Sequence, residues 1–161
     1  YQQDSLEQLA KLTAEFSAYS SPVLGRPEPL DLVELARQVA SPYPGQVEFA
    51  AQGPLMINAD RTRLSGALLN LVKNGVEAGG PVELEVCRHE GGLRVRCHDR
   101  GPGIAVEHQA QVGEPFFTTK ARGTGLGLAT VKQLAAAYQG RFTLENRPGG
   151  GASAELWLPS P

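Results

Sequence analysis

The segment from residue 82 to residue 98 constrains the fold most, because apolar and polar residues alternate along VELEVCRH and again along GLRVRCH. Such alternation is typical of strands that bury one face. The two runs predict an antiparallel hairpin that turns at Gly91 and Gly92. Its inward-facing residues are expected to be Val82, Leu84, Val86, Leu93, Val95 and Cys97. Cys87 then points to the opposite face, so we expect no disulfide between the two cysteines, and a cytosolic redox setting fits.

Length and charge narrow the class of protein. At about 100 to 200 residues per domain, 161 residues allow one substantial domain and a short extra element. Fifteen basic and 17 acidic residues give a net charge of −2, so the chain lacks the general attraction expected of a nucleic-acid binder. No apolar stretch reaches the roughly 18 residues of a membrane helix, and no signal peptide is recognisable. We therefore expect cytoplasmic material, although the parent protein can still be membrane-anchored.

The chain divides into three expected parts. Residues 1–20 carry an apolar stripe at helical spacing but no N-cap, which favours the end of a longer helix. Residues 21–27 begin a proline-rich linker, and residues 28–159 form the main domain. The elements expected there are helix 31–40 capped by Asp31 with Glu34 at the capping-box position, strands 47–51 and 55–57, helix 60–78, the 82–98 hairpin, helix 126–138 and a hairpin of 141–146 with 152–158. This order predicts an α+β fold with helices on one face of a mixed, largely antiparallel sheet.

Two glycine-rich segments indicate a nucleotide site. Asp99 follows a predicted strand and begins DRGPGI, where glycines let a backbone approach a flat ligand; a tight turn with Asp99 as its Asx residue is the alternative. The run GTGLGL at 123–128 opens a helix, where exposed N–H groups bind phosphate. Neither a dinucleotide-binding unit nor a Walker loop fits this segment. Lys120 and Arg122 are candidate charge clamps, or else solvated side chains.

Two asparagines on one helix suggest a metal ligand. Asn70 and Asn74 are spaced i, i+4 and share a helical face. A buried amide needs a partner, and an amide oxygen suits Mg²⁺, which keeps several waters and binds phosphates as well. A pair of surface amides is the alternative. Lys73 lies on another face and contacts either phosphate or solvent.

Four motifs in a fixed order resemble a known family. NLVKN at 70–74, DRGPGI at 99–104, EPFFTTK at 114–120 and GTGLGLA at 123–129 resemble the N, first glycine, F and second glycine boxes of sensor histidine kinases. These belong to the GHKL ATPase superfamily, and PFFTTK before GTGLGLA is most similar to the nitrogen-regulation branch. The resemblance covers roughly residues 28–159. It implies a two-layer α/β sandwich of the GHKL (Bergerat) ATP-binding type, preceded by a short helix.

The resemblance also implies a role for each matched residue. Asp99 would accept a hydrogen bond from the adenine amino group of ATP or ADP, and Asn74 would hold Mg²⁺. Asn70 stands where hydrolytic relatives carry a glutamate; because an amide is no general base, this favours phosphoryl transfer. Asn70 and Lys120 are the catalytic candidates. The nucleotide-binding set is Asn70, Lys73, Asn74, Glu77, Asp99, Gly101, Gly103, Ile104, Phe117, Thr119, Lys120, Gly123, Thr124, Gly125, Leu126, Gly127 and Leu128.

The sequence departs from the family pattern at two places. Glu77 and Ala78 stand where many members have a basic residue and a tyrosine, which puts those ligand contacts in doubt. The usual Gly-Thr near the C-terminus reads Gly151-Ala152, and Ser153 is the remaining candidate to replace the lost hydroxyl.

No histidine of this chain is a suitable phosphoacceptor. His89 lies at the expected hairpin turn, His98 in a strand at the pocket edge, and His108 in a loop or short helix. The resemblance then implies that residues 1–20 end a dimerisation helix and that the acceptor histidine lies on the rest of that domain. The implied partners are this domain and a response regulator, in a homodimeric parent whose fragment is a monomer or weak dimer.

The leading hypothesis is therefore the catalytic domain of a sensor histidine kinase, an enzyme that transfers the γ-phosphoryl of ATP to histidine in two-component signal transduction. A serine kinase of the anti-sigma type is a second reading, which the helix and proline-rich linker before the domain disfavour. A nucleotide-sensing module without transfer activity is the third, and Glu77 and the missing acceptor leave it open. A plain α/β domain whose glycines only form turns is the remaining alternative.

Overall fold

The computed structural model describes residues 25–79, 81–103 and 127–160. The predicted helix over 1–20 lies outside these residues. In chain order the elements are β1 (Glu28–Asp31), α2 (Leu32–Ala40), β2 (Val47–Ala51), β3 (Met56–Ala59), α3 (Arg61–Gly79), β4 (Val82–His89), β5 (Gly92–His98), α5 (Gly127–Ala137), β6 (Arg141–Asn146) and β7 (Ala152–Pro159). In this part of the chain no helix combines the length and apolar character needed to cross a membrane.

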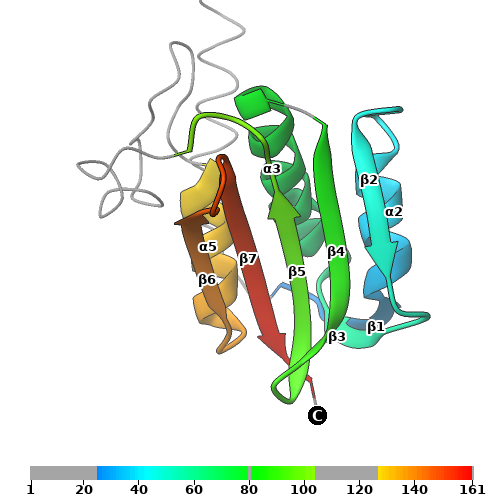
Figure 1. Ribbon diagram of the computed structural model, residues 1–161. Helices are drawn as coiled ribbons and strands as arrows, with labels where there is room; N and C mark the ends of the chain where they lie inside the picture. The colour runs from blue at the N-terminus through cyan, green and yellow to red at the C-terminus, as the bar shows by residue number, and fades with distance from the viewer. Residues whose placement is uncertain (1–24, 80, 104–126, 161) are drawn as a thin grey trace, which may run out of the picture.

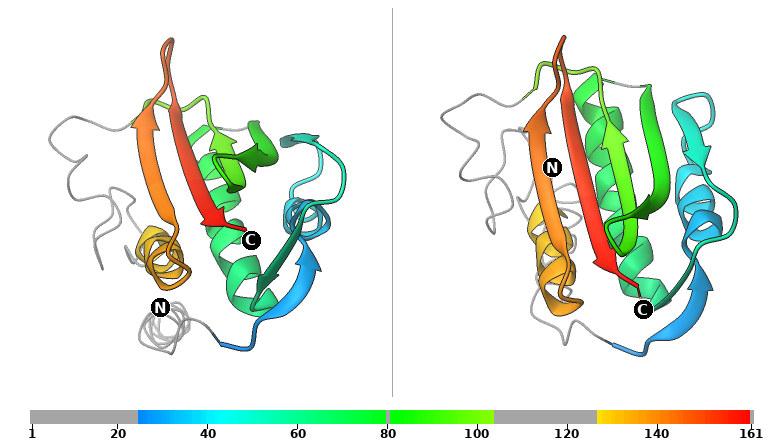
Figure 2. Two further views of the ribbon diagram at one scale, coloured as in Figure 1. Left: turned by 90° about the horizontal axis from the view of Figure 1, so that it is seen from below. Right: turned by 60° about the horizontal axis from the view of Figure 1, so that its bottom comes forward.

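One mixed sheet forms the centre of the domain. Its five strands run in the order β2-β4-β5-β7-β6. The β2–β4 pair is parallel and the other pairs are antiparallel. Helices α2, α3 and α5 lie together on one face of this sheet (Figures 1 and 2). The predicted α+β architecture is confirmed.

The core lies between the sheet and the helices, as the alternation predicts. Leu84, Val95 and Leu156 come from neighbouring strands and are at most 2% exposed. The opposite side of the sheet, called the open face below, carries charged residues such as Glu85, Arg96 and Glu155. Cys87 lies on the open face, where its Sγ is 3.9 Å from Glu85 Oε1. Both cysteines are free, as expected.

The structure corrects two details of the prediction. Residues 28–31 were not predicted as a strand: they form β1, which pairs with β3 in a separate two-stranded sheet. Because Leu30 is the single buried residue of β1, the strand has no readable period. The hairpin turns at Glu90 and Gly91, with φ of 49° and 76°, and Gly92 belongs to β5. Gly92 packs against the ring of Trp157 on the neighbouring strand, where a larger residue would clash with that ring.

Capping carboxylates join the helices to neighbouring elements. Asp31 caps α2 as predicted: its Oδ1 accepts from the N–H groups of Val33 and Leu55, each at 3.0 Å. Asp60 precedes α3 and accepts the N–H of Arg63 at 3.0 Å and of Arg26 at 2.7 Å. These two hydrogen bonds lower the pKa of Asp60. Each cap therefore fixes both a helix start and a segment distant in sequence.

Candidate functional site

Asp99 is held at the end of β5 by backbone hydrogen bonds. Its Oδ1 accepts from Gly101 N–H at 2.9 Å and from Ala152 N–H at 3.0 Å. Its own N–H donates to the Ala152 carbonyl at 2.9 Å. Arg147 Nη1 donates to the Asp99 carbonyl at 3.0 Å. The Asx turn considered from the sequence is thus present, and β7 also orients the carboxylate.

This carboxylate is buried yet has an acceptor atom to spare. Among the described residues, Asp99 is the only polar or charged side chain in the buried class, at 9% exposure. Within the same part of the chain, both hydrogen bonds to the carboxylate end on Oδ1. Burying a charge is costly unless it is well hydrogen-bonded. The arrangement fixes Oδ1 and leaves Oδ2 as an acceptor for a ligand donor.

The loop after Asp99 lies directly on the end of α3. A Cβ placed on Gly101 would meet the backbone of Ala78, and one on Gly79 would lie 3.0 Å from Gly101 Cα. Gly103 has a φ of +80°, where glycine is favoured, and a Cβ there would lie 2.7 Å from Asn146 Oδ1. The two predicted site glycines of this loop therefore allow a close approach of backbone, between α3 on one side and β6 on the other.

Helix α3 also reaches the start of α5. Asn70 Oδ1 lies 3.4 Å from the position of a Cβ on Gly127, the first residue of α5. Asn70 and Ala78 are eight residues apart, which corresponds to about 12 Å along the helix. The ends of α3 and β5 and the start of α5 lie toward one end of the sheet (Figure 1). The structure thus brings Asn70 and Gly127 together from two predicted boxes, while the loop after Asp99 packs at the far end of the same helix.

The remaining predicted site residues fall into two groups. Lys73, Asn74 and Leu128 are half-buried on α3 and α5, and Glu77 is exposed near the end of α3. The others, together with Arg122 and His108, lie outside the described residues: Ile104, Phe117, Thr119, Lys120, Gly123, Thr124, Gly125 and Leu126.

Sequence reasoning missed the contribution of the β6–β7 hairpin. Arg147 and Ala152 bond to Asp99 from about 50 positions away, a contact that no local pattern reveals. The Gly151-Ala152 departure was the one available signal. Ala152 uses its backbone N–H, while Ser153, which pairs with His98, follows it along β7 and lies on the other face. Ser153 therefore does not replace the missing hydroxyl.

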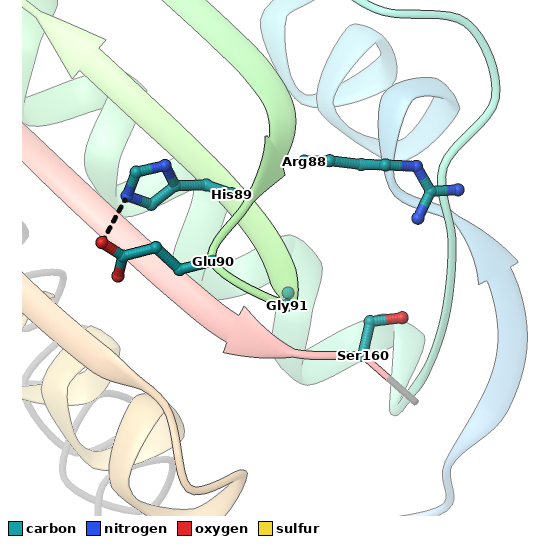
Figure 3. Close-up of a pocket in the computed structure, with 6 residues that line it drawn as sticks. Arg88, His89, Glu90, Gly91 and Ser160 are labelled. Atoms are coloured by element: carbon teal, nitrogen blue, oxygen red, sulfur yellow. Dashed lines mark ion pairs between the residues drawn. The ribbon is translucent and has the colours of Figure 1, made fainter.

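The two described histidines lie in the predicted strands, with His98 as the last residue of β5. His89 ends β4 at the hairpin turn and lies 3.5 Å from Glu90 as an ion pair. It borders a shallow hollow of about 310 Å³ next to Ser160, and Figure 3 shows this ion pair beside the turn. The turn precedes β5, whereas Asp99 follows the other end of that strand. No helix surrounds His89, so it lacks the setting of a phosphoacceptor.

Burial sets the electrostatics around the end of β5. Burial lowers the pKa of His98, and the nearby Arg147 guanidinium lowers it further. Burial, with the Asp99 charge as the second cause, raises the pKa of the Cys97 thiol to about 12. The thiol therefore stays protonated near neutral pH and is no nucleophile.

The fold and the site define a class of protein. Residues 59–161 match the family of histidine kinase-, DNA gyrase B-, and HSP90-like ATPases. The chain belongs to this family, in agreement with the resemblance of its four boxes.

Sensor histidine kinases are among the proteins to which the chain is similar. It is 35% identical over 131 residues to the sensor histidine kinase ZraS of Escherichia coli K12, covering 79% of this chain and 28% of that protein. It thus spans less than a third of the length of this curated relative. Full-length ShkA, solved in complex with AMPPNP, is 29% identical with a TM-score of 0.83, covering 98% of this chain and 37% of that one. ThkA, solved with the response regulator TrrA, is 26% identical with a TM-score of 0.76, covering 99% and 49%.

Proposed function

We propose that residues 28–159 are the catalytic domain of a sensor histidine kinase and bind ATP or ADP next to Asp99. The observation that carries this proposal is the Asp99 carboxylate, whose Oδ1 is fixed by two backbone N–H groups while Oδ2 accepts no hydrogen bond within the described part of the chain. A buried, oriented acceptor fits an exocyclic amino group such as that of adenine. The bound nucleotide in ShkA supports the same assignment.

The triphosphate would extend from Asp99 along α3 toward the start of α5. Gly127 and Leu128 begin a helix whose positive end favours phosphate. Asn70 lies next to Gly127, and Lys73, about one turn further along α3, would contact phosphate. The predicted residues outside the described part, with Lys120 among them, would complete this region.

The donor set beside the phosphate region fits Mg²⁺. Asn70 and Asn74 present amide groups from one face of α3, and no cluster of three or more His, Cys, Asp or Glu side chains occurs among the described residues. One or two oxygen donors from the protein suit Mg²⁺, because phosphates and water supply its other ligands. Asn74 would hold the ion, which when bound neutralises phosphate charge.

In the complete protein the reaction would be phosphoryl transfer. The bond between the γ-phosphorus and the bridging oxygen breaks, a bond from that phosphorus to an imidazole nitrogen forms, and ADP leaves. This chemistry depends on positioning and charge neutralisation more than on covalent help. Asn70 cannot remove a proton from water, so its placement supports transfer rather than hydrolysis.

The partners follow from the missing acceptor. Residues 1–20 would end a dimerisation helix, and residues 21–27 would link it to the domain. The acceptor histidine would lie on the dimerisation domain of a homodimeric parent, with this fragment alone a monomer or weak dimer. A response regulator would receive the phosphoryl group, as the ThkA–TrrA complex suggests. We further propose that the parent belongs to the nitrogen-regulation branch. The domain would lie in the cytoplasm, whether or not the parent is anchored in a membrane.

Calorimetric titration of ATP, ADP and GTP with Mg²⁺ tests the nucleotide site. Asp99→Asn keeps the oxygen that accepts from Gly101 and Ala152 but puts an N–H donor in place of Oδ2, so the fold should persist and adenine should be repelled. Losing a hydrogen bond to a charged group corresponds to about 10- to 100-fold weaker ATP binding. Glu34→Gln, which removes one exposed charge on α2, is the control and should bind like the wild type.

Two outcomes would contradict the proposal. The first is wild-type protein that binds no adenine nucleotide, and the second is Asp99→Asn binding ATP as tightly as wild type. Transfer is tested separately with labelled ATP and the parent's dimerisation domain. ATP binding without labelled histidine would identify a nucleotide-sensing module instead.

A further inference from the structure

The β6–β7 turn lies against the main chain of Asp99. Arg147 Nη1 donates to the Asp99 carbonyl at 3.0 Å, from a position 48 residues later in the chain. Ala152, at the other end of this turn, exchanges two further hydrogen bonds with Asp99. A Cβ on Gly151 would overlap the same carbonyl, so the turn and the strand end are in direct contact.

We propose that Arg147 is a positioning residue of the nucleotide site: its guanidinium holds the first peptide of the DRGPG loop and thereby fixes the direction of the Asp99 carboxylate toward adenine. This inference rests on the proposed function and deepens it. Of the three hydrogen bonds between the hairpin and Asp99, the Arg147 bond is the one that a side chain supplies. It is therefore the bond that substitution can remove without altering the strand pairing.

The turn that carries Arg147 is itself constrained. Arg147 N–H donates to the Gly151 carbonyl at 2.9 Å, and Gly150 N–H donates to the Arg147 carbonyl at 3.2 Å. Gly149, Gly150 and Gly151 have φ values of +87°, +116° and +84°, which glycine adopts readily. These hydrogen bonds close the turn, and Arg147 is half-buried in it. The turn therefore holds the Arg147 side chain in one position relative to Asp99.

The charge of Arg147 strengthens this contact. A guanidinium stays charged at all relevant pH values, and hydrogen bonds with an ionised partner are stronger than neutral ones. The same charge lowers the pKa of the neighbouring His98, so its field reaches the end of β5. Gly101 rests on Ala78 at the other side of the loop. The loop is therefore held between α3 and the hairpin, and on the hairpin side the Arg147 side chain holds it by a hydrogen bond.

Base selectivity should report this role better than affinity alone. If the Asp99 carboxylate loses its direction, the contact with the adenine amino group weakens, whereas phosphate contacts near Asn70 and Gly127 stay unchanged. Binding of ATP should then fall while binding of GTP, which has no amino group at that place, stays nearly constant. A purely structural loss would weaken both nucleotides together.

The experiment is a titration of ATP and GTP, each with Mg²⁺, into wild type and three single variants. We expect Arg147→Ala to bind ATP about 5- to 20-fold more weakly, with GTP changed less than about twofold. Arg147→Lys, which keeps a charged donor, should recover part of the ATP affinity. Arg141→Ala is the matched control: it removes an arginine from the other end of β6, where it pairs with Glu90 and stacks over Trp157. It should leave both affinities unchanged.

A double-mutant cycle with Asp99→Asn distinguishes a positioning role of Arg147 from a purely structural one. In the Asp99→Asn background, Arg147→Ala should change ATP affinity less than about twofold, because the group it positions is already altered. An equal loss in both backgrounds, or an equal loss of ATP and GTP, would overturn the proposal. Should Arg147→Ala fail to fold, Arg147→Gln carries the same cycle. Wild type that does not prefer ATP over GTP would instead contradict the proposed function, so the two failures are distinguishable.

Discussion

Gly75 lies where α3 presses on the sheet, and its replacement by alanine tests that contact. A Cβ at this position would lie 2.8 Å from Val82 Cγ1 and 3.0 Å from Cys97 Sγ. Favourable carbon contacts lie at about 3.5–4.0 Å. Val82 and Cys97 are 1% and 2% exposed, so neither can move aside without disturbing the core.

Two opposing terms set the expected magnitude. Alanine in place of glycine inside a helix stabilises by about 0.5–1 kcal/mol through lower backbone entropy and better helix propensity. Overpacking a filled core costs about 1–3 kcal/mol. Gly66 lies on the same helix with nothing within 4 Å of a built Cβ, so Gly66→Ala isolates the first term. We expect Gly66→Ala to stabilise by about 0.5–1 kcal/mol and Gly75→Ala to fall about 1–3 kcal/mol below it.

Urea unfolding followed by far-UV circular dichroism measures both variants. The decisive quantity is the difference between them, because the propensity gain is common to both. Val82→Ala removes the nearer clashing atom, so Gly75→Ala should cost less in that background. Equal stabilisation by Gly66→Ala and Gly75→Ala would refute the close approach of α3 to the sheet.

Two further predictions concern ionisable groups on the open face. Because the pKa of His98 is lowered in the folded state, the unfolded chain protonates first as pH falls through about 6.5, and folding is weakened. Wild type should therefore lose more stability than His98→Gln between pH 7 and pH 5 in urea titrations, and equal losses would contradict this. Glu155 accepts from Arg96 Nε at 2.7 Å in a partly buried network, so Glu155→Gln should destabilise by about 1 kcal/mol. Glu28→Gln, at an exposed pair, should stay within about 0.5 kcal/mol of wild type in the same assay.

Much of the fold was predictable because its burial pattern is periodic. The 82–98 segment alternates except at Cys87 and around the turn, and the structure buries the predicted inward-facing residues. Helix 60–78 was predicted from its apolar face and matches Arg61–Gly79. The parallel pairing of β2 with β4 is not encoded locally, since the two strands are separated by β3 and α3.

The missed details have physical causes. Strand β1 has one buried residue, Leu30, which follows the exposed Pro27 and Pro29, so neither periodicity nor propensity identifies the strand. The hairpin turn was predicted one residue too late, at Gly91 and Gly92, because Gly92 resembles a turn glycine in the sequence. Gly92 is instead small because the Trp157 ring covers it from the neighbouring strand. Both errors arise from partners that lie far away in the sequence.

The glycines of the site show how packing and ligand binding overlap. The sequence associated Gly101 and Gly127 with nucleotide approach, yet Gly101 lies against the Ala78 backbone and Gly127 faces Asn70, both on α3. A side chain on Gly101 would push the loop away from α3 whether or not a nucleotide is bound. A glycine substitution that abolishes binding therefore cannot show that the glycine touches the ligand. Asp99→Asn is the sharper test, because it keeps the shape and the Oδ1 hydrogen bonds and changes only Oδ2, the atom that we propose accepts from adenine.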